Sequence, residues 1–173
     1  EGRAVSKRLV CHFSCGTSSA VAAKLALSQY RDRIETVVLR IRIANEHSDN
    51  DRFSDDVAIW LDHPITTIQS AKYTDTWDVY ERERFLVSPQ GARCTTEMKK
   101  IPGRKFWRDG DLDVFGYGVR EKKRVFNLKA NNPELTVLTP LISAELDKPD
   151  CHALIQRAGI RLPVMYELGF RNN

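Results

Sequence analysis

The chain has 173 residues, a length that suits one domain, and its 42% hydrophobic and 29% charged residues are typical of a soluble globular protein. No apolar run reaches the length of a transmembrane helix, and residues 1–8 lack a signal-peptide pattern. Four cysteines without CxxC spacing argue against a structural zinc site and a disulfide scaffold, which favours a reducing, cytoplasmic setting. The net charge of +4 is unevenly placed, because residues 72–129 hold fourteen basic and nine acidic residues. We therefore look for an anionic ligand in the middle third.

In chain order, the hydrophobic pattern predicts alternating strands and helices. Strands are expected at residues 8–13, 35–43, 65–68, 112–117 and 136–138. Helices are expected at residues 20–27, 51–61, 76–87, 95–100, 119–129 and 148–158, with a loop at 88–93, a flexible start at 1–7 and an irregular tail at 160–173. This order predicts one α/β domain, residues 1–173, with an open, mostly parallel sheet and helices on both faces. Ligands of such sheets bind beyond the carboxyl ends of the strands.

A loop of small and hydroxyl-bearing residues follows the first predicted strand and precedes an almost wholly apolar helix. It consists of Ser14, Cys15, Gly16, Thr17, Ser18 and Ser19. Backbone N–H groups at a helix start attract phosphate, and glycine lets a ligand approach the backbone closely. The pattern is neither a Walker loop nor a GxGxxG dinucleotide loop. It therefore predicts either a phosphate-binding loop or an ordinary strand-to-helix turn with serine caps.

Two basic segments of the middle third are further candidates for anion binding. Residues 93–108 hold six basic residues and one acidic residue, and lysines near a helix start bind phosphate as point charges. Residues 116–124 place two arginines four positions apart, which puts them on one face of a helix. Each segment also fits an ordinary solvated helix face. The candidates in the two segments are Arg93, Lys99, Lys100, Gly116, Arg120 and Arg124.

Five segments, in order along nearly the whole chain, resemble the phosphoadenosine phosphosulfate (PAPS) reductase family of PP-loop, adenine nucleotide alpha-hydrolase-like proteins, and its short phage-encoded members most of all. Residues 14–19 resemble the SGGxDS loop, and residues 45–53 resemble the segment after the second strand. Residues 94–102 fit C-x4-K-x2-P, and residues 116–124 resemble a G-x-R segment with a downstream arginine. Residues 140–170 resemble the closing stretch of PL, an Asp-capped helix, LP, Tyr and Gly-aromatic.

The resemblance implies a Rossmann-like three-layer fold with a site for an adenine nucleotide. By this resemblance, residues 14–19 would hold the phosphate or sulfate end, and Lys99, Arg120 and Arg124 would neutralise phosphates. Asn45 and Glu46 would line the pocket after the second strand. The parent reaction is thiolate attack on the sulfur of PAPS, which yields sulfite and adenosine 3′,5′-bisphosphate, with a thioredoxin or glutaredoxin as thiol donor.

The chain departs from this family at several positions. Cys15 stands where the family usually has Gly, and Ser18 stands where it usually has Asp, which argues against ATP cleavage. Cys94 is single, so no iron–sulfur cluster is expected, and no covalently bound cofactor is implied. The family's catalytic cysteine lies beyond the Gly-aromatic segment, and no cysteine follows Cys151 in this chain. The catalytic residue therefore stays unassigned, and with it whether the chain is an active reductase.

Two alternatives stay open. One is a PP-loop ATP pyrophosphatase, an adenylating or sulfur-transfer enzyme, which would need magnesium. The other is a non-catalytic nucleotide- or nucleic-acid-binding module, for which Trp77, Tyr80 and Trp107 offer aromatic rings near the basic third. A small, localised charge surplus favours a nucleotide over nucleic acid. No membrane partner is expected, a homodimer is left open, and a phage or bacterial origin is suggested.

Overall fold

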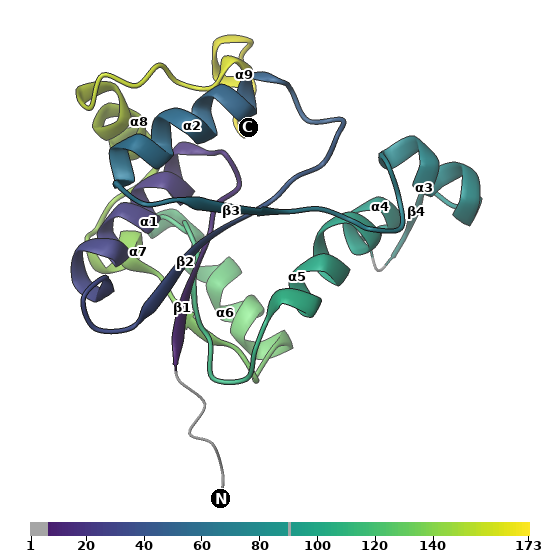
Figure 1. Cartoon of the computed structure of the whole chain (residues 1–173), viewed down its shortest axis with the longest axis horizontal. Coiled ribbons are helices and arrows are strands. Elements are labelled where there is room, and N and C mark those ends of the chain that lie inside the picture. Colours follow the sequence, from purple (N-terminus) through teal and green to yellow (C-terminus); the bar gives the residue numbers. More distant parts are fainter. Residues whose placement is uncertain (1–6, 90) are drawn as a thin grey trace, which may run out of the picture.

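The structure is a computed structural model that describes residues 7–89 and 91–173. Its centre is a five-stranded parallel sheet in the order β3-β2-β1-β6-β7 (Figure 1). The strands are β1 (Arg8–His12), β2 (Glu35–Ile41), β3 (Ile65–Ile68), β6 (Leu112–Val114) and β7 (Thr136–Leu138). All five lie where the hydrophobic runs predict strands, although β1, β2 and β6 end before those runs do.

The strand order reverses at β1. The chain runs outward from β1 through β2 and β3, and then returns to the other side of β1 for β6 and β7. Cys11 of β1 therefore lies between Val38 of β2 and Val114 of β6. Such a reversal opens a crevice beyond the carboxyl ends of two neighbouring strands, because the connections that follow them lead to opposite sides. In this chain those strands are β1 and β6.

Helices cover both faces of the sheet, which gives the molecule three layers (Figure 1). The main helices are α1 (Thr17–Tyr30), α2 (Asp49–Leu61), α5 (Ile101–Phe106), α6 (Lys122–Asn131), α7 (Pro140–Ser143) and α8 (Lys148–Arg157). On one face α1 packs against α2, α7 and α8. On the other face lie α5 and α6. The predicted α/β fold, with a parallel sheet between two helical layers, is confirmed.

Side chains of β1 alternate between the two helical layers. Leu9, Cys11 and Phe13 are buried in the main core with α1. The Arg8 side chain points to the opposite face of the sheet, where its guanidinium lies over the Phe106 ring of α5, 4.6 Å from the ring centre. It also forms an ion pair at 2.7 Å with Asp111, and both side chains are almost fully buried. This ion pair fixes the start of β1 to the turn that precedes β6.

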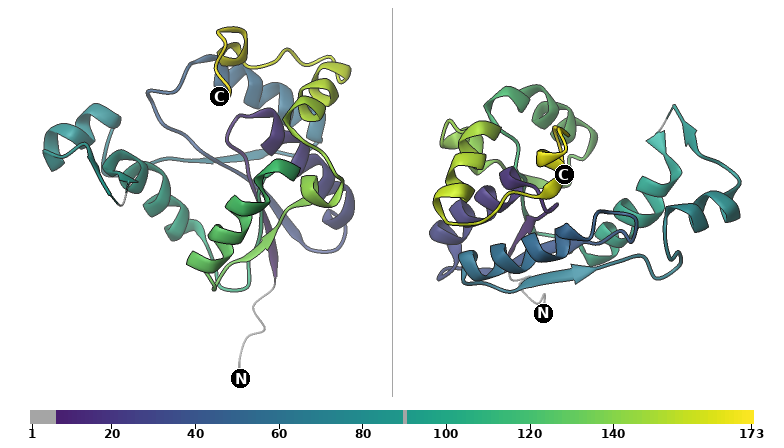
Figure 2. Two further views of the ribbon diagram at one scale, coloured as in Figure 1. Left: turned by 180° about the vertical axis from the view of Figure 1, so that it is seen from behind. Right: turned by 90° about the horizontal axis from the view of Figure 1, so that it is seen from above.

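Residues 72–100, called the arm below, project away from the three layers (Figure 2). Their elements are α3 (Thr76–Glu83), β4 (Val87–Ser88), β5 (Gly91–Ala92), α4 (Arg93–Thr95) and the π-helical turn η1 (Thr96–Lys100). A small core of Tyr73, Val79 and Met98 holds them together. The helix predicted for 76–87 ends at Glu83, because Arg84 adopts a left-handed φ of 50°. The loop predicted for 88–93 contains the short ribbon β4–β5.

Two further segments differ from their predictions. The helix predicted for 119–129 begins as a separate 3-10 turn, η2 (Val119–Glu121), before α6. The tail predicted to be irregular, residues 160–173, contains a short helix, α9 (Val164–Glu167), so that prediction was wrong there. Of the predicted flexible start, residues 1–6 lie outside the described residues. Within the described part of the chain, no helix is long and apolar enough to cross a bilayer.

Candidate functional site

The loop between β1 and α1 is a tight turn closed by its own serines. Cys15 adopts a left-handed φ of 57°, and Gly16 is the extended residue that precedes the first turn of α1. Ser19 Oγ accepts a hydrogen bond from Ser14 N at 3.2 Å and donates one to the Gly16 carbonyl at 2.9 Å. The first hydrogen bond of helix α1 runs from the Ala20 N–H to the Gly16 carbonyl, at 3.1 Å. The backbone N–H groups that precede Ala20 therefore have no acceptor within the helix. The positive end of the α1 dipole therefore faces the crevice.

The loop after β6 lies directly against this turn. A Cβ added at Gly116 would lie 2.7 Å from the carbonyl carbon of Ser18 and 2.7 Å from the backbone nitrogen of Ser19. Only glycine allows the two backbones to approach so closely. The β1 loop and the β6 loop thus form a single rigid floor at the point where the strand order reverses.

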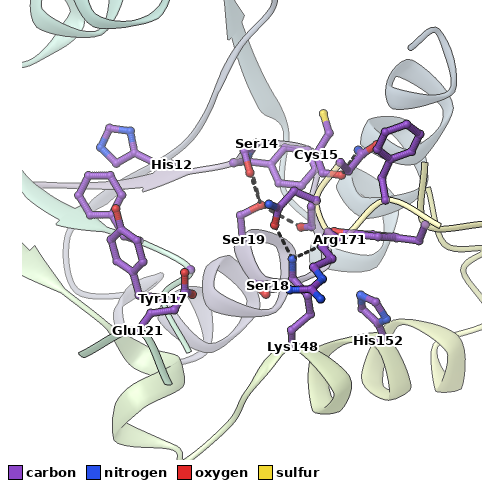
Figure 3. A pocket seen from close by; sticks show the side chains of 18 of the residues that line it. His12, Ser14, Cys15, Ser18, Ser19, Tyr117, Glu121, Lys148, His152 and Arg171 are labelled. Carbon is purple, nitrogen blue, oxygen red and sulfur yellow. Dashed lines mark hydrogen bonds between the residues drawn. The ribbon is translucent and has the colours of Figure 1, made fainter. Parts of the chain in front are cut away.

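A large cavity of about 1210 Å³ opens above this floor. Figure 3 shows His12 and Tyr117 on one side of the loop serines, with Lys148 and His152 on the other. The wall of the cavity is formed by the β1 and β6 loops, the ends of β2 and η1, the start of α8, and the tail from Leu162 onward. Segments far apart in the sequence therefore meet at the predicted crevice.

Most of the predicted site residues line this cavity. Those in the wall are Ser14, Cys15, Gly16, Ser18, Ser19, Glu46, Lys99, Gly116, Arg120 and Arg124. Four others lie elsewhere. Thr17 is buried behind the loop, and Asn45 uses its side-chain oxygen to accept hydrogen bonds from the backbone N–H and hydroxyl of Thr76. Arg93 lies in the arm, paired with Glu83 and Glu97, and Lys100 is exposed outside the wall.

The three predicted basic side chains of the wall are each paired with a carboxylate. Lys99 Nζ lies 3.1 Å from an oxygen of Glu46, which joins η1 to the segment after β2. Arg120 Nε lies 2.8 Å from Asp147, and the Arg120 side chain is 87% exposed. Arg124 pairs with Glu121. Exposed pairs of this kind contribute little to stability, so these cations can turn toward an anionic ligand at small cost.

Sequence reasoning missed a histidine–aspartate pair at the end of β1. His12 Nε2 lies 2.7 Å from Asp113 Oδ1 on β6, and the imidazole stacks on the Phe115 ring with centroids 4.4 Å apart. The His12 side chain is 28% exposed and lines the cavity, whereas that of Asp113 is 3% exposed. Because the two residues are about a hundred positions apart, nothing in the local pattern of either strand signals the pair.

The tail and α8 supply a second group of wall residues. Tyr166 of α9 packs against His152 of α8, with ring centroids 4.6 Å apart and the ring planes tilted by 49°. Lys148 Nζ donates to Asn172 Oδ1 at 2.7 Å. Burial raises the pKa of Tyr166, and burial together with Lys148 lowers the pKa of His152. These residues face the loop because the tail folds back across it, and Asn173 donates from its side chain to the Cys15 carbonyl.

The cysteines are poorly suited to act as thiolates in this cavity. Burial raises the pKa of Cys15 and of Cys11 to about 12, and that of Cys151 to about 11. Cys94 lies in the arm, where its sulfur is 3.2 Å from the Tyr80 hydroxyl. Among the described residues, no group of three or more His, Cys, Asp or Glu side chains is arranged to hold a metal ion.

The parallel sheet, its reversal between β1 and β6 and the surrounding helices define a PAPS reductase-like fold, as comparison with solved structures confirms. One such structure is the PAPS reductase from Candida auris, determined as a phosphate complex. Its TM-score is 0.62 at 10% sequence identity, over 94% of this chain and 78% of that chain. No family model and no curated protein sequence matches this chain.

Proposed function

We propose that this chain is a PAPS reductase-like protein that binds an adenine nucleotide or sulfonucleotide in the cavity between β1 and β6. The proposal rests on one observation, which is that a helix start and three cationic side chains from separate segments lie at the same cavity. The start of α1, whose first N–H groups have no partner within the helix, lies at the cavity. Lys99 from η1, Arg120 from η2 and Arg124 from α6 line the same cavity. A helix start together with several cations is a site for a multiply charged phosphate ligand.

The parts of the cavity suit different parts of such a ligand. The loop of residues 14–19 would hold the 5′-phosphate or sulfate, with N–H donors and serine hydroxyls. Lys99 would exchange its contact with Glu46 for a phosphate oxygen, and the two arginines would offer planar, bidentate donors. In the parent reaction, reduction of PAPS to sulfite and adenosine 3′,5′-bisphosphate, these groups would stabilise charge on the departing phosphate.

The reductase reaction also needs a thiolate that attacks sulfur. Cys15 lines the cavity, but its pKa of about 12 keeps it protonated near neutral pH. Cys94 lies in the arm, outside the cavity wall. We therefore propose that a thiol reaches the cavity from beyond the described residues or from a thioredoxin- or glutaredoxin-type partner. We expect no iron–sulfur cluster, and magnesium only in the ATP-using alternative.

Calorimetric titration tests this proposal. The protein is titrated with PAPS, adenosine 3′,5′-bisphosphate and ATP, each with and without magnesium. Sub-millimolar binding of the 3′-phosphorylated ligands without metal supports the reductase lineage, whereas magnesium-dependent ATP binding favours the ATP-using alternative. Absence of binding by all three would refute the nucleotide proposal, and steeply salt-dependent binding of an oligonucleotide would then favour the nucleic-acid module.

Neighbouring lysines provide a matched pair of variants for the same titration. Lys99→Ala removes a cation from the cavity wall, so we expect affinity for adenosine 3′,5′-bisphosphate to fall about tenfold. Lys100→Ala removes the same charge one residue away, outside the wall, and should leave the affinity nearly unchanged. Equal losses in the two variants would show that only overall charge matters.

A further inference from the structure

The His12–Asp113 pair has the geometry of an acid–base group. An ionised carboxylate can only accept hydrogen bonds, so the contact of 2.7 Å places a proton on His12 Nε2, which donates to Asp113 Oδ1. In the neutral imidazole the other nitrogen, Nδ1, is then a free proton acceptor. That nitrogen has no hydrogen-bond partner among residues 7–89 and 91–173, and it is not buried. Because His12 lines the cavity, Nδ1 is accessible to a molecule there.

The surroundings of Asp113 strengthen this arrangement. Its second oxygen, Oδ2, is buried without a partner in the described part of the chain, so the imidazole is the main group that compensates the carboxylate. A buried carboxylate of this kind holds the imidazole in one tautomer and stabilises the imidazolium formed when Nδ1 takes up a proton. The Phe115 ring, parallel to the imidazole within 1°, fixes the plane of the ring.

The described residues of the cavity offer a better acid–base group than nucleophile. Cys15 is held as a thiol by burial, and no other cysteine among the described residues lines the cavity. His152 also lines it, but within residues 7–89 and 91–173 its buried Nε2 has no partner and no carboxylate orients its ring. Of the histidines and cysteines in the wall, His12 is therefore the best placed to take a proton from water.

We propose that His12, oriented by Asp113, activates water in this cavity for hydrolysis of the phosphosulfate anhydride of a nucleoside 5′-phosphosulfate. The inference rests on the proposed nucleotide site, but it adds a reaction that needs no thiol and no reductant. His12 is the catalytic residue, and Asp113 is a positioning residue.

The step balances with water as the second reactant. As the water oxygen forms a bond to sulfur, one of its protons passes to His12 Nδ1. The bond between sulfur and the bridging oxygen breaks, and its electron pair stays on that oxygen, which becomes a terminal oxygen of the 5′-phosphate. The N–H groups at the start of α1 would stabilise this charge. The product at sulfur is hydrogensulfate, which loses the second water proton to bulk water and becomes sulfate. The other product is the nucleotide 5′-phosphate, and the imidazolium returns its extra proton to bulk water.

The test measures sulfate release from PAPS by the purified chain without any thiol. We expect wild type to release sulfate, and His12→Ala to do so at least about a hundredfold more slowly, as for loss of a general base. Added imidazole should restore part of the rate in His12→Ala. The matched control is His63→Ala, because His63 is only partly buried and lies outside the cavity wall. It should release sulfate at the wild-type rate.

Asp113→Asn tests the positioning role. The carboxamide no longer fixes the tautomer, so we expect slower release and a changed pH profile, with unchanged affinity for adenosine 3′,5′-bisphosphate. Thermal melting shows which variants are folded. If Asp113→Asn does not fold, His12→Ala and its rescue decide the question.

Several outcomes would overturn the inference. Nucleotide binding without sulfate release by wild type would refute hydrolysis and leave the proposed nucleotide site intact. An unchanged rate in His12→Ala, or a lost rate that imidazole does not restore, would exclude His12 as the base. Failure of wild type to bind any of the nucleotides would instead refute the proposed function itself, and the hydrolysis proposal with it.

Discussion

Gly116→Ala is the substitution that most directly probes how the site is built. The new Cβ would lie 2.7 Å from two backbone atoms of Ser18 and Ser19 and 2.8 Å from the Ser18 carbonyl oxygen, where ordinary carbon contacts are about 3.5–4.0 Å. These are backbone atoms of α1, so no side-chain rotation relieves the clash, and the β6 loop must move away. Overpacking of this kind costs about 1–3 kcal/mol, partly offset by the lower entropy of an unfolded chain with alanine. We expect the free energy of unfolding to fall by about 1–2 kcal/mol.

The assay is denaturant unfolding followed by circular dichroism, combined with titration of adenosine 3′,5′-bisphosphate. Gly103→Ala is the control. Gly103 lies within helix α5, and its new Cβ would meet only the terminal methyl of the Ile41 side chain, at 3.3 Å. Alanine is the better helix former there, so the control should be neutral or more stable. Wild-type stability and wild-type affinity in Gly116→Ala would refute the view that the two loops form one rigid floor.

Three further predictions concern other parts of the chain. Arg8→Ala should lower the free energy of unfolding by about 3–5 kcal/mol in denaturant titrations, because it leaves the buried Asp111 carboxylate unpaired; a loss typical of a surface pair would contradict this. Hydrogen bonds from Arg52 lower the pKa of Asp49 from its usual 3.8 to about 2. The ionised Asp49 carboxylate therefore stabilises the folded state fully above about pH 4, and this stabilisation is lost as pH falls through 2. Asp49→Asn should therefore flatten the fall in melting temperature over that interval, and an unchanged slope would argue against the contact. Brief alkylation at pH 8, read by peptide mass spectrometry, should modify Cys94 before Cys15, and the reverse order would contradict the inertness of the loop thiol.

The order of strands and helices could be predicted because local hydrophobic runs carry that information. Residues 8–12 and 65–68 form strands, and the alternation with helices gives a parallel sheet. The errors lie where one backbone angle or a tertiary contact decides. Helix α3 ends at Glu83 because Arg84 is left-handed, and arginine is a residue type that no local rule marks as a helix end. Helix α9 is only four residues long and packs on the loop of a distant strand, so its periodicity is too short to detect.

The candidate site could be predicted in part for the same reason. Ser14 and Gly16 belong to a contiguous loop with a recognisable pattern, and Lys99 and Arg120 lie in segments whose charge is visible in the sequence. His12 could not be found, because its partner Asp113 is on another strand and each residue alone fits an ordinary strand position. Pairing partners such as Glu46 for Lys99 also depend on the folded arrangement.

The central claim, that an adenine nucleotide binds at the loop between β1 and α1, is tested most directly by backbone amide NMR. Adenosine 3′,5′-bisphosphate is titrated into the isotopically labelled protein without magnesium, and the shift of each amide signal is followed to saturation. The claim predicts large, saturable shifts at Thr17, Ser18, Ser19 and Gly116, and none in helix α3 of the arm. Saturation with unmoved loop amides, or with shifts confined to the arm, would contradict it.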